Sequence, residues 1–393
     1  MQTENVKKTV AKIFNEIADT LETGQYGPKI RVGVTTLGSE HGISNVVKGA
    51  ELAQDRNKTI EVVLIGPKVD SSLTQIIVDN EDEAYKKMEE MLDNNEINSC
   101  VTMHYNFPIG VSTVGRVITP GKGKEMFIAT TTGTSSSNRA EAMVKNGIYG
   151  IITAKAMGIE NPTVGILNVD GARQVERIFK ELISNGYDIK LTESTRADGG
   201  CVMRGNDLLA GTPDIMVTDT LTGNILMKVF SAYTTGGSYE SLGFGYGPGI
   251  GEDYNRLILI ISRASGSPVI ANAINYAADL AKGKIFDIAR SEFEKANKAN
   301  LKEILKSLNK DSVKKDEKKE IKSPDKEVVT ATIDGIDIME LDDAVSVLWE
   351  NQIYAESGMG CTGPIVMVNE NNLKKAIDVL ANAGYNVKKA EEC

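Results

Sequence analysis

A cysteine framed by glycines is the residue of this sequence best suited to covalent chemistry. Cys361 lies in the segment SGMGCTGP of residues 357–364, directly before the apolar run 365–368. Glycines leave the approach to the sulfur unhindered, and nearby backbone N–H groups can lower a thiol pKa or hold an oxyanion. The pattern predicts a tight turn that presents a reactive thiol; the alternative is a small buried filler. The supporting residues would be Gly358, Gly360, Thr362 and Gly363.

The other cysteines and the two histidines offer little further chemistry. Cys100 precedes an apolar run and Cys201 follows two glycines, so we interpret both as structural. Cys393 ends the chain and is either a free thiol or an exchange partner. The sequence has no C-x-x-C motif and only two histidines, so it predicts neither disulfides nor a metal site.

A second candidate is the segment 219–228, DTLTGNILMK, which follows the apolar run 215–217. A strand that leads into a helix through hydroxyl, glycine and amide residues offers free N–H groups and a helix dipole to an anion. We therefore expect a phosphate or acyl-oxyanion site here, although simple helix capping explains the same residue types. The residues concerned are Asp219, Thr222, Gly223, Asn224 and Lys228.

Three further stretches carry weaker signals. Residues 130–139, TTTGTSSSNR, repeat the hydroxyl and glycine pattern and add an arginine. Residues 234–251 hold seven glycines and favour a plain surface loop over a mobile lid or an anion-binding loop. Neither matches a dinucleotide or P-loop fingerprint, so the sequence supports neither NAD nor ATP. His41 follows the first apolar run, at a position where α/β proteins commonly bind ligands.

Alternating strands and helices must position these groups. Short apolar runs at 30–34, 60–65, 126–130, 163–169, 214–218 and 257–261 are separated by helical patterns, for example at 45–54, 175–185 and 272–282. This alternation predicts a doubly wound α/β fold with a mostly parallel sheet covered on both faces. Residues 4–22 add an amphipathic helix that we expect to pack on a neighbour.

A charged segment divides the chain. Between residues 309 and 327, charged side chains fill 13 of 19 positions, which is too polar to bury. We predict an α/β domain over 1–285, a charged helical or flexible tether over 286–327, and a small cysteine-bearing α/β domain over 328–393.

Composition and charge indicate what kind of protein this is. The 393 residues are 41% hydrophobic with 37 glycines, which is typical of a folded globular protein. The formal net charge of −10 disfavours nucleic acid as a partner. No apolar run approaches the roughly 18 residues that a membrane crossing needs, so we expect a cytoplasmic protein that does not enter the membrane.

The first 285 or so residues resemble the phosphate acyltransferase family of fatty acid and phospholipid synthesis. The matching stretches are 30–34 through 38–42, 61–66, 164–169, and 213–219 continuing to 222–224. The resemblance implies a doubly wound fold and transfer of a thioester-bound acyl group to inorganic phosphate. Where relatives often carry a histidine, this chain has Ala271-Asn272-Ala273 after residues 267–270. His41 is then the base nearest to a matched motif.

Over its full length, the chain resembles the component C alpha subunits of glycine, sarcosine and betaine reductases. That resemblance implies that Cys361 carries an acetyl thioester derived from a carboxymethylated selenoprotein A, and that inorganic phosphate releases acetyl phosphate. The phosphate cradle would be Asp219, Thr222, Gly223, Asn224 and Lys228. It further implies a beta subunit as partner, an oligomeric assembly, and no cofactor besides the co-substrate phosphate.

Two alternatives remain open from the sequence. One is an acyl-carrier-protein phosphate acyltransferase of lipid synthesis, against which the added cysteine domain argues. The other is a non-catalytic scaffold that assembles a larger complex through its first helix and acidic surface. The sequence leaves open whether glycine, sarcosine or betaine is the substrate of the reductase.

Overall fold

The computed structural model describes residues 29–196, 199–314, 322–336, 340–360, 363–385 and 387–389, with residues 10, 13, 14, 17, 18, 20, 21 and 24 before them. For residues 309–314, 359, 360, 363, 388 and 389 it describes the backbone alone. The chain divides into two compact units. The first consists of Met1–Leu167 with Leu182–Ala299, and the second of Asn168–Glu181 with Asn300–Cys393.

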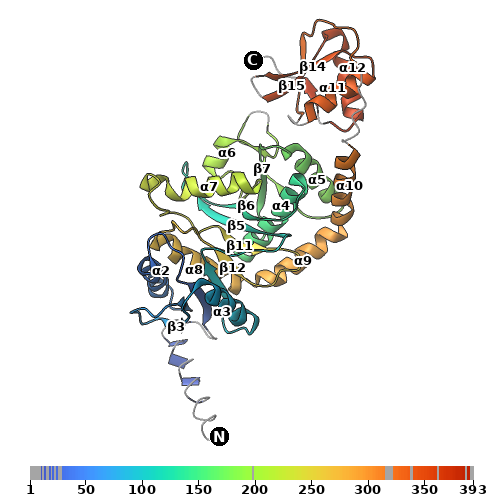
Figure 1. The fold of residues 1–393 in the computed structure, drawn as a ribbon. Coiled ribbons are helices and arrows are strands. Elements are labelled where there is room, and N and C mark those ends of the chain that lie inside the picture. The colour runs from blue at the N-terminus through green and yellow to red at the C-terminus, as the bar shows by residue number, and fades with distance from the viewer. Residues whose placement is uncertain are drawn as a thin grey trace. The chain divides into compact units, whose positions relative to one another are not determined.

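A large sheet forms the centre of the first unit (Figure 1). Its strands are β1 (Ile30–Thr35), β2 (Ile60–Gly66), β3 (Thr74–Ile77), β4 (Ser99–Thr102), β5 (Val111–Ile118), β6 (Glu125–Thr134), β7 (Thr163–Leu167), β8 (Lys190–Leu191), β9 (Val202–Met203), β10 (Ile215–Val217), β11 (Gly247–Ile250) and β12 (Ile258–Ile260). Their order is β3-β2-β1-β4-β12-β11-β5-β6-β10-β7-β8, with β9 beside β7. The apolar runs predicted as strands all lie in this sheet.

Most of the strand pairing is parallel, as predicted. The pairs β1–β2, β2–β3, β1–β4, β4–β12, β6–β10, β7–β10, β7–β8 and β7–β9 are parallel. Three central pairs, β5–β6, β5–β11 and β11–β12, are antiparallel. The prediction of a mostly parallel α/β fold is confirmed, and the antiparallel centre was not predicted.

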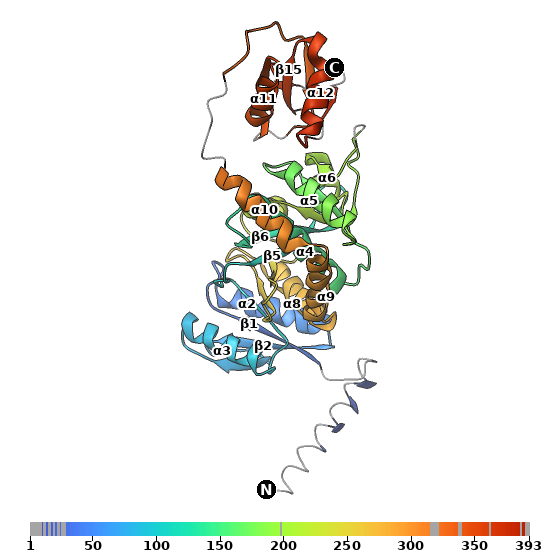
Figure 2. The same cartoon turned by 90° about the vertical axis from the view of Figure 1, so that its right-hand side faces the viewer.

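Helices cover the sheet of this unit (Figures 1 and 2). They are α2 (Ile43–Arg56), α3 (Glu81–Asp93), α4 (Arg139–Ala156), α6 (Gly205–Ala210), α7 (Thr220–Ala232), α8 (Ser267–Lys282) and α9 (Ile285–Lys298), with the short 3-10 helix η1 (Tyr233–Thr235) after α7. Where α2 and α8 pack together, a Cβ on Gly49 would lie 2.7 Å from Cβ of Ile270, so glycine permits this close helix contact. Helix α9 buries Phe293 with its ring centroid 5.9 Å from that of Tyr149 in α4.

The glycine-rich stretch 234–251 is not the plain loop that its composition predicts. Residues Gly247–Ile250 form the buried strand β11 at the centre of the sheet. A Cβ on Gly247 would lie 1.7 Å from the carbonyl oxygen of Val114, and one on Gly249 would lie 2.3 Å from the Phe107 ring. These glycines therefore allow close packing inside the sheet.

The apolar residues of the helix predicted over 4–22 were expected to pack on a neighbouring element, but those that the structure describes are exposed. Apart from Ala18 and Thr20, the described residues of the predicted helix are Val10, Ile13, Phe14, Ile17 and Leu21. These five are helical and between 45% and 82% exposed.

No described helix combines the length and hydropathy that a bilayer crossing needs.

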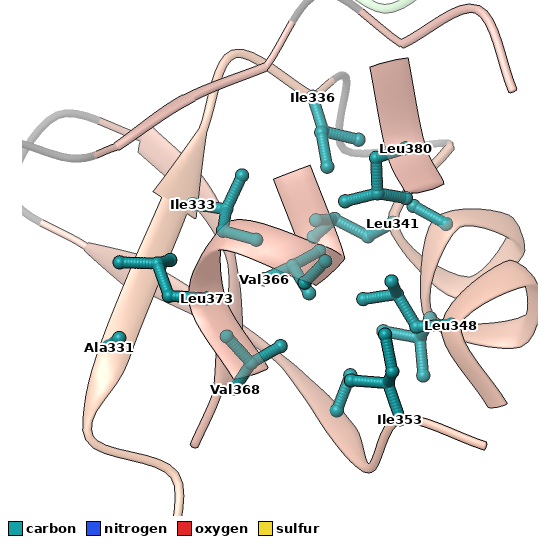
Figure 3. Packing of buried hydrophobic residues seen from close by; sticks show 14 residues of the cluster. Ala331, Ile333, Ile336, Leu341, Leu348, Ile353, Val366, Val368, Leu373 and Leu380 are labelled. Carbon is teal, nitrogen blue, oxygen red and sulfur yellow. The ribbon is translucent and has the colours of Figure 1, made fainter. Parts of the chain in front are cut away.

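The second unit contains a smaller, antiparallel sheet. Its strands β13 (Ala331–Asp334), β14 (Ala355–Gly360), β15 (Gly363–Val368) and β16 (Lys388–Lys389) take the order β14-β15-β13-β16. Helices α11 (Leu341–Glu350) and α12 (Leu373–Asn382) pack against this sheet, with η3 (Glu370–Asn372) before α12. Figure 3 shows the buried core between them, where Leu348, Val366 and Leu380 are fully buried.

The second unit also contains the helices α5 (Ala172–Ser184) and α10 (Leu301–Lys314). Most of α5 belongs to this unit, and its last residues, from Leu182 on, belong to the first. The segment 286–327, predicted as a charged helical or flexible tether, includes all of α9 except Ile285 and all of α10. In the small unit, residues Ala355–Gly360 form a regular strand where the sequence predicted only a turn.

Candidate active site

The glycine-framed cysteine lies, in the sequence, between two strands that pair antiparallel. Strands β14 and β15 run in register from Ala355 opposite Val368 to Gly360 opposite Gly363. Gly358 lies inside β14, where a Cβ would approach Cε of Met367 to 2.9 Å. Cys361 and Thr362, which follow Gly360 in the sequence, lie outside the described residues, as does Cys393. The reactive thiol therefore remains a prediction.

The N-terminus of α7 is capped by Asp219. Its carboxylate accepts hydrogen bonds from the backbone N–H of Thr222 at 3.1 Å and from the Thr222 hydroxyl at 2.7 Å. Arg139 adds an ion pair at 3.0 Å. Burial alone would raise the pKa of Asp219, but the bonds from Thr222 and the Arg139 guanidinium hold it below its usual value. An anion at this helix end would meet a carboxylate that is already ionised.

The structure brings together the two hydroxyl-rich stretches that the sequence singled out. A Cβ on Gly223 would lie 1.7 Å from the carbonyl oxygen of Thr130, so only glycine fits there. The Asn224 amide donates to the carbonyl of Thr131 at 3.1 Å. Gly223 and Asn224 therefore hold α7 against β6, which is a packing role in addition to any ligand contact.

Lys228 lies one helical turn beyond Asn224 in α7, but it makes its side-chain contacts with other residues. It comes eight residues after the start of α7, which is about 12 Å along the helix axis. Its ammonium group donates to the hydroxyl of Ser262 at 2.6 Å and to Oε1 of Glu240 at 3.2 Å. The predicted cradle thus divides into the capped start of α7 and a separate group around Lys228.

The loop after β12, which Lys228 contacts through Ser262, adjoins the loop after β1. Strands β1, β4 and β12 are adjacent and parallel, so their carboxyl ends meet at one edge of the sheet. His41 follows β1, while Ser262 and Arg263 follow β12. The two loops are joined by the backbone N–H of Glu40, which donates to the carbonyl of Arg263 at 2.9 Å.

An aromatic contact links His41 to the same loops. The His41 ring lies edge-on to Tyr239 with centroids 6.1 Å apart, and Tyr239 directly precedes Glu240. Both His41 and Arg263 are exposed. We refer to His41, Lys228, Glu240, Ser262 and Arg263 as the Lys228 cluster. His41, Ser262 and Arg263 follow the carboxyl ends of the parallel strands β1 and β12, a location suited to ligand binding, and Lys228 is joined to this region through Ser262.

Sequence reasoning missed Glu240 and Ser262. The available signal was the run of small and polar residues Ser262–Ser267, one residue after the buried strand β12, which marks the carboxyl end of a parallel strand. Glu240 lies in the glycine-rich stretch, and no local pattern indicates that its side chain turns inward.

The described cysteines are buried, as expected for structural residues. Cys100 lies in β4 and Cys201 precedes β9, at 0% and 5% exposure. Burial raises the pKa of the Cys100 thiol far above its usual value. Among the described residues, no group of histidine, cysteine and carboxylate side chains could hold a metal ion.

Comparison with known proteins fits this architecture. The family model described as "Fatty acid synthesis protein" matches residues 30–367. The "Glycine/sarcosine/betaine reductase complex component C subunit alpha" of Peptoclostridium acidaminophilum is 65% identical over 380 residues, covering 97% of this chain and 99% of that protein. The chain belongs to the family of component C alpha subunits, within the fatty acid synthesis protein family.

Other similar proteins match only part of this chain. The "Phosphate acyltransferase" of Petrotoga mobilis (strain DSM 10674 / SJ95) is 28% identical over 236 residues, covering 51% of this chain and 71% of that protein. Among solved structures, a branched-chain phosphotransacylase from Enterococcus faecalis V583 is 16% identical with a TM-score of 0.43, covering 64% of this chain and 99% of that one.

Proposed function

We propose that this chain is the acetyl-transferring subunit of an amino-acid reductase complex, which releases a Cys361-bound acetyl group to inorganic phosphate as acetyl phosphate. The observation that carries the proposal is the 65% identity to a component C alpha subunit across 97% of the chain, since it includes the small cysteine-bearing unit. The reductase would use glycine, sarcosine or betaine.

The proposed step is a phosphorolysis. An oxygen of hydrogen phosphate attacks the carbonyl carbon of the acetyl thioester, a C–O bond forms, and the C–S bond breaks with its electron pair going to sulfur. The products are acetyl phosphate and the Cys361 thiolate, and the phosphate proton passes to the thiolate or to water. Because a thiolate leaves readily, the step needs an oriented phosphate and a stabilised oxyanion more than a strong base. The scarcity of histidine is compatible with such chemistry.

The Lys228 cluster is our proposed phosphate site. Lys228 retains half of its side-chain exposure although its ammonium group is held by Glu240 and Ser262. Arg263 and His41 supply further positive or hydrogen-bonding groups on the adjoining loops. We propose that the capped start of α7, with Asp219, Thr222, Gly223 and Asn224, supports this site by fixing the helix that carries Lys228.

Replacing Lys228 by methionine should lower kcat/KM for phosphate about 100-fold, because a charge-assisted contact to the anion is lost while the apolar stem remains. Steady-state arsenolysis of acetyl phosphate measures this, since arsenate takes the place of phosphate. The matched control is Lys58→Met, which removes a lysine from an exposed ion pair with Asp55. An unchanged kcat/KM in the Lys228 variant would show that the anion binds elsewhere.

Alkylation of the native protein should label Cys361 well before Cys100 and Cys201. Only the thiolate reacts, and burial keeps Cys100 in its neutral thiol form throughout the pH range 7 to 9. Raising the pH across this range should therefore not speed the labelling of Cys100. Timed treatment with iodoacetate followed by peptide mapping gives the order, and first labelling at Cys100 or Cys201 would contradict the assignment.

The proposal includes partners. We propose that the chain works in the cytoplasm with a component C beta subunit and receives its acetyl group by way of a carboxymethylated selenoprotein A. The exposed apolar residues near the N-terminus, such as Phe14 and Leu21, support the proposal of an oligomeric assembly.

A second candidate function is phosphate acyltransfer from acyl carrier protein, which the 28% identity to a phosphate acyltransferase favours. That identity covers only half of this chain and does not explain the small cysteine-bearing unit. Assay of the Cys361→Ser protein with an acyl carrier protein thioester separates the two, because activity that survives this substitution would favour the lipid reaction.

A further inference from the structure

Glu240 is a charged side chain inside the molecule, with 2% exposure. Its two carboxylate oxygens are occupied: Oε2 accepts from the Ser265 hydroxyl at 2.9 Å, and Oε1 accepts from Lys228 at 3.2 Å and from the Tyr246 hydroxyl at 3.4 Å. A buried carboxylate is stable only when it is paired and hydrogen-bonded in this way.

The backbone of Glu240 is also fixed. Its N–H donates to the carbonyl of Ala264 at 2.9 Å, and its own carbonyl accepts from the N–H of Gly266 at 2.8 Å. Glu240 is therefore fastened, through both backbone and side chain, to the same loop that carries Ser262.

The side chains of Glu240 and Ser262 hold the ammonium group of Lys228, which also lies 5.9 Å from the centre of the Tyr246 ring. A lysine ammonium has three donors, and within the described residues two of them go to Glu240 and Ser262. Ser262 is itself oriented, because its hydroxyl accepts from the N–H of Ala264 at 3.1 Å. One ammonium donor remains for a ligand on the exposed side of Lys228.

We propose that Glu240 is a positioning residue, which fixes the Lys228 ammonium group so that its third donor meets a phosphate oxygen. This inference rests on the proposed function. It gives a specific role to Glu240, which is not among the site residues predicted from the sequence. A long lysine side chain loses considerable conformational freedom when it binds an anion, and a buried partner that fixes it beforehand removes part of that cost.

The proposal predicts an effect opposite in sign to simple charge repulsion. Glu240 is an anion close to a proposed anion site, so repulsion alone would make Glu240→Gln bind phosphate more tightly. Positioning predicts weaker binding, with the phosphate KM and the phosphate Kd rising about 10-fold and kcat changing less. Glu240→Asp keeps the charge but shortens the reach, so its phosphate KM should fall between those of the wild type and Glu240→Gln.

The test uses the full chain and inorganic phosphate as the probe. Phosphate binding by isothermal titration calorimetry and the arsenate KM in acetyl phosphate arsenolysis are measured for the wild type, Glu240→Gln, Glu240→Asp and Ser262→Ala. The matched control is Glu292→Gln, because Glu292 is equally buried and is paired with Lys155 at 2.9 Å, with Lys295 at 2.8 Å and with Tyr187. It should lose stability without a change in phosphate Kd.

Weaker phosphate binding in Glu240→Gln and Ser262→Ala, with partial recovery in Glu240→Asp, supports the proposal. Tighter or unchanged binding in Glu240→Gln overturns it, as does an equal rise in Kd for Glu292→Gln. If Glu240→Gln does not fold, Glu240→Asp and Ser262→Ala decide by the same criterion. If the wild-type protein binds phosphate but forms no acetyl phosphate, the proposed function is contradicted and the binding test stays valid. If the wild-type protein binds no phosphate, the positioning role is overturned.

Discussion

Replacing Cys361 by serine is expected to lower acetyl phosphate arsenolysis by at least about a thousandfold. A serine hydroxyl is a much weaker nucleophile than a thiolate, and an oxygen ester would not release its acyl group to phosphate as readily as a thioester. Steady-state measurement of acetyl phosphate consumption in the presence of arsenate gives the ratio.

The control for this substitution is Cys100→Ala, which removes the thiol buried in β4. It should cost roughly 1 kcal/mol of stability through lost packing while the folded protein keeps its activity. If Cys361→Ser arsenolyses acetyl phosphate at the wild-type rate, no covalent intermediate on this cysteine takes part in the reaction.

Replacing Gly223 by alanine should reduce the free energy of unfolding by at least about 3 kcal/mol. The added Cβ would lie 1.7 Å from the carbonyl oxygen of Thr130, and neither backbone can yield without shifting α7 from β6. Because α7 also carries Lys228, the folded fraction should bind phosphate more weakly. Denaturant titration followed by circular dichroism measures the stability change.

Gly205→Ala, at the start of α6, is the matched control for this prediction. A Cβ there would meet no atom within 4 Å, so its stability should stay within about 0.5 kcal/mol of the wild type. Equal stability of the Gly223 and Gly205 variants would show that the close contact between α7 and β6 does not matter to the fold.

The sequence was informative where hydrophobic patterning is strong. Strand β2 reads IEVVLIG and is buried along nearly its whole length, which is typical of a parallel strand covered on both faces. A strand that leads into a helix was predicted over 215–228, and the structure has such a connection from β10 to α7, with Asp219 as the cap of the helix. The fold class follows from such elements.

The other features of the fold and the site depend on contacts between residues far apart in the sequence, which local patterns do not indicate. The glycines of β11 and β14 read as turns, because composition does not indicate that Gly247 faces the Val114 carbonyl or that Gly358 faces Met367. The site was grouped by nearness in sequence, so Lys228 was assigned to the start of α7. Its contacts with Glu240 and Ser262 span 12 and 34 residues, and only the folded chain brings them together.

The central claim is that Cys361 carries the acetyl group until phosphate removes it. The most direct measurement is mass spectrometry of the intact protein and its peptides after brief incubation with acetyl phosphate, followed by a chase with inorganic phosphate. We predict one added acetyl group, mapped to Cys361, that disappears during the chase as acetyl phosphate forms. An acetyl group found on another residue, or one on Cys361 that survives the chase, would contradict the claim.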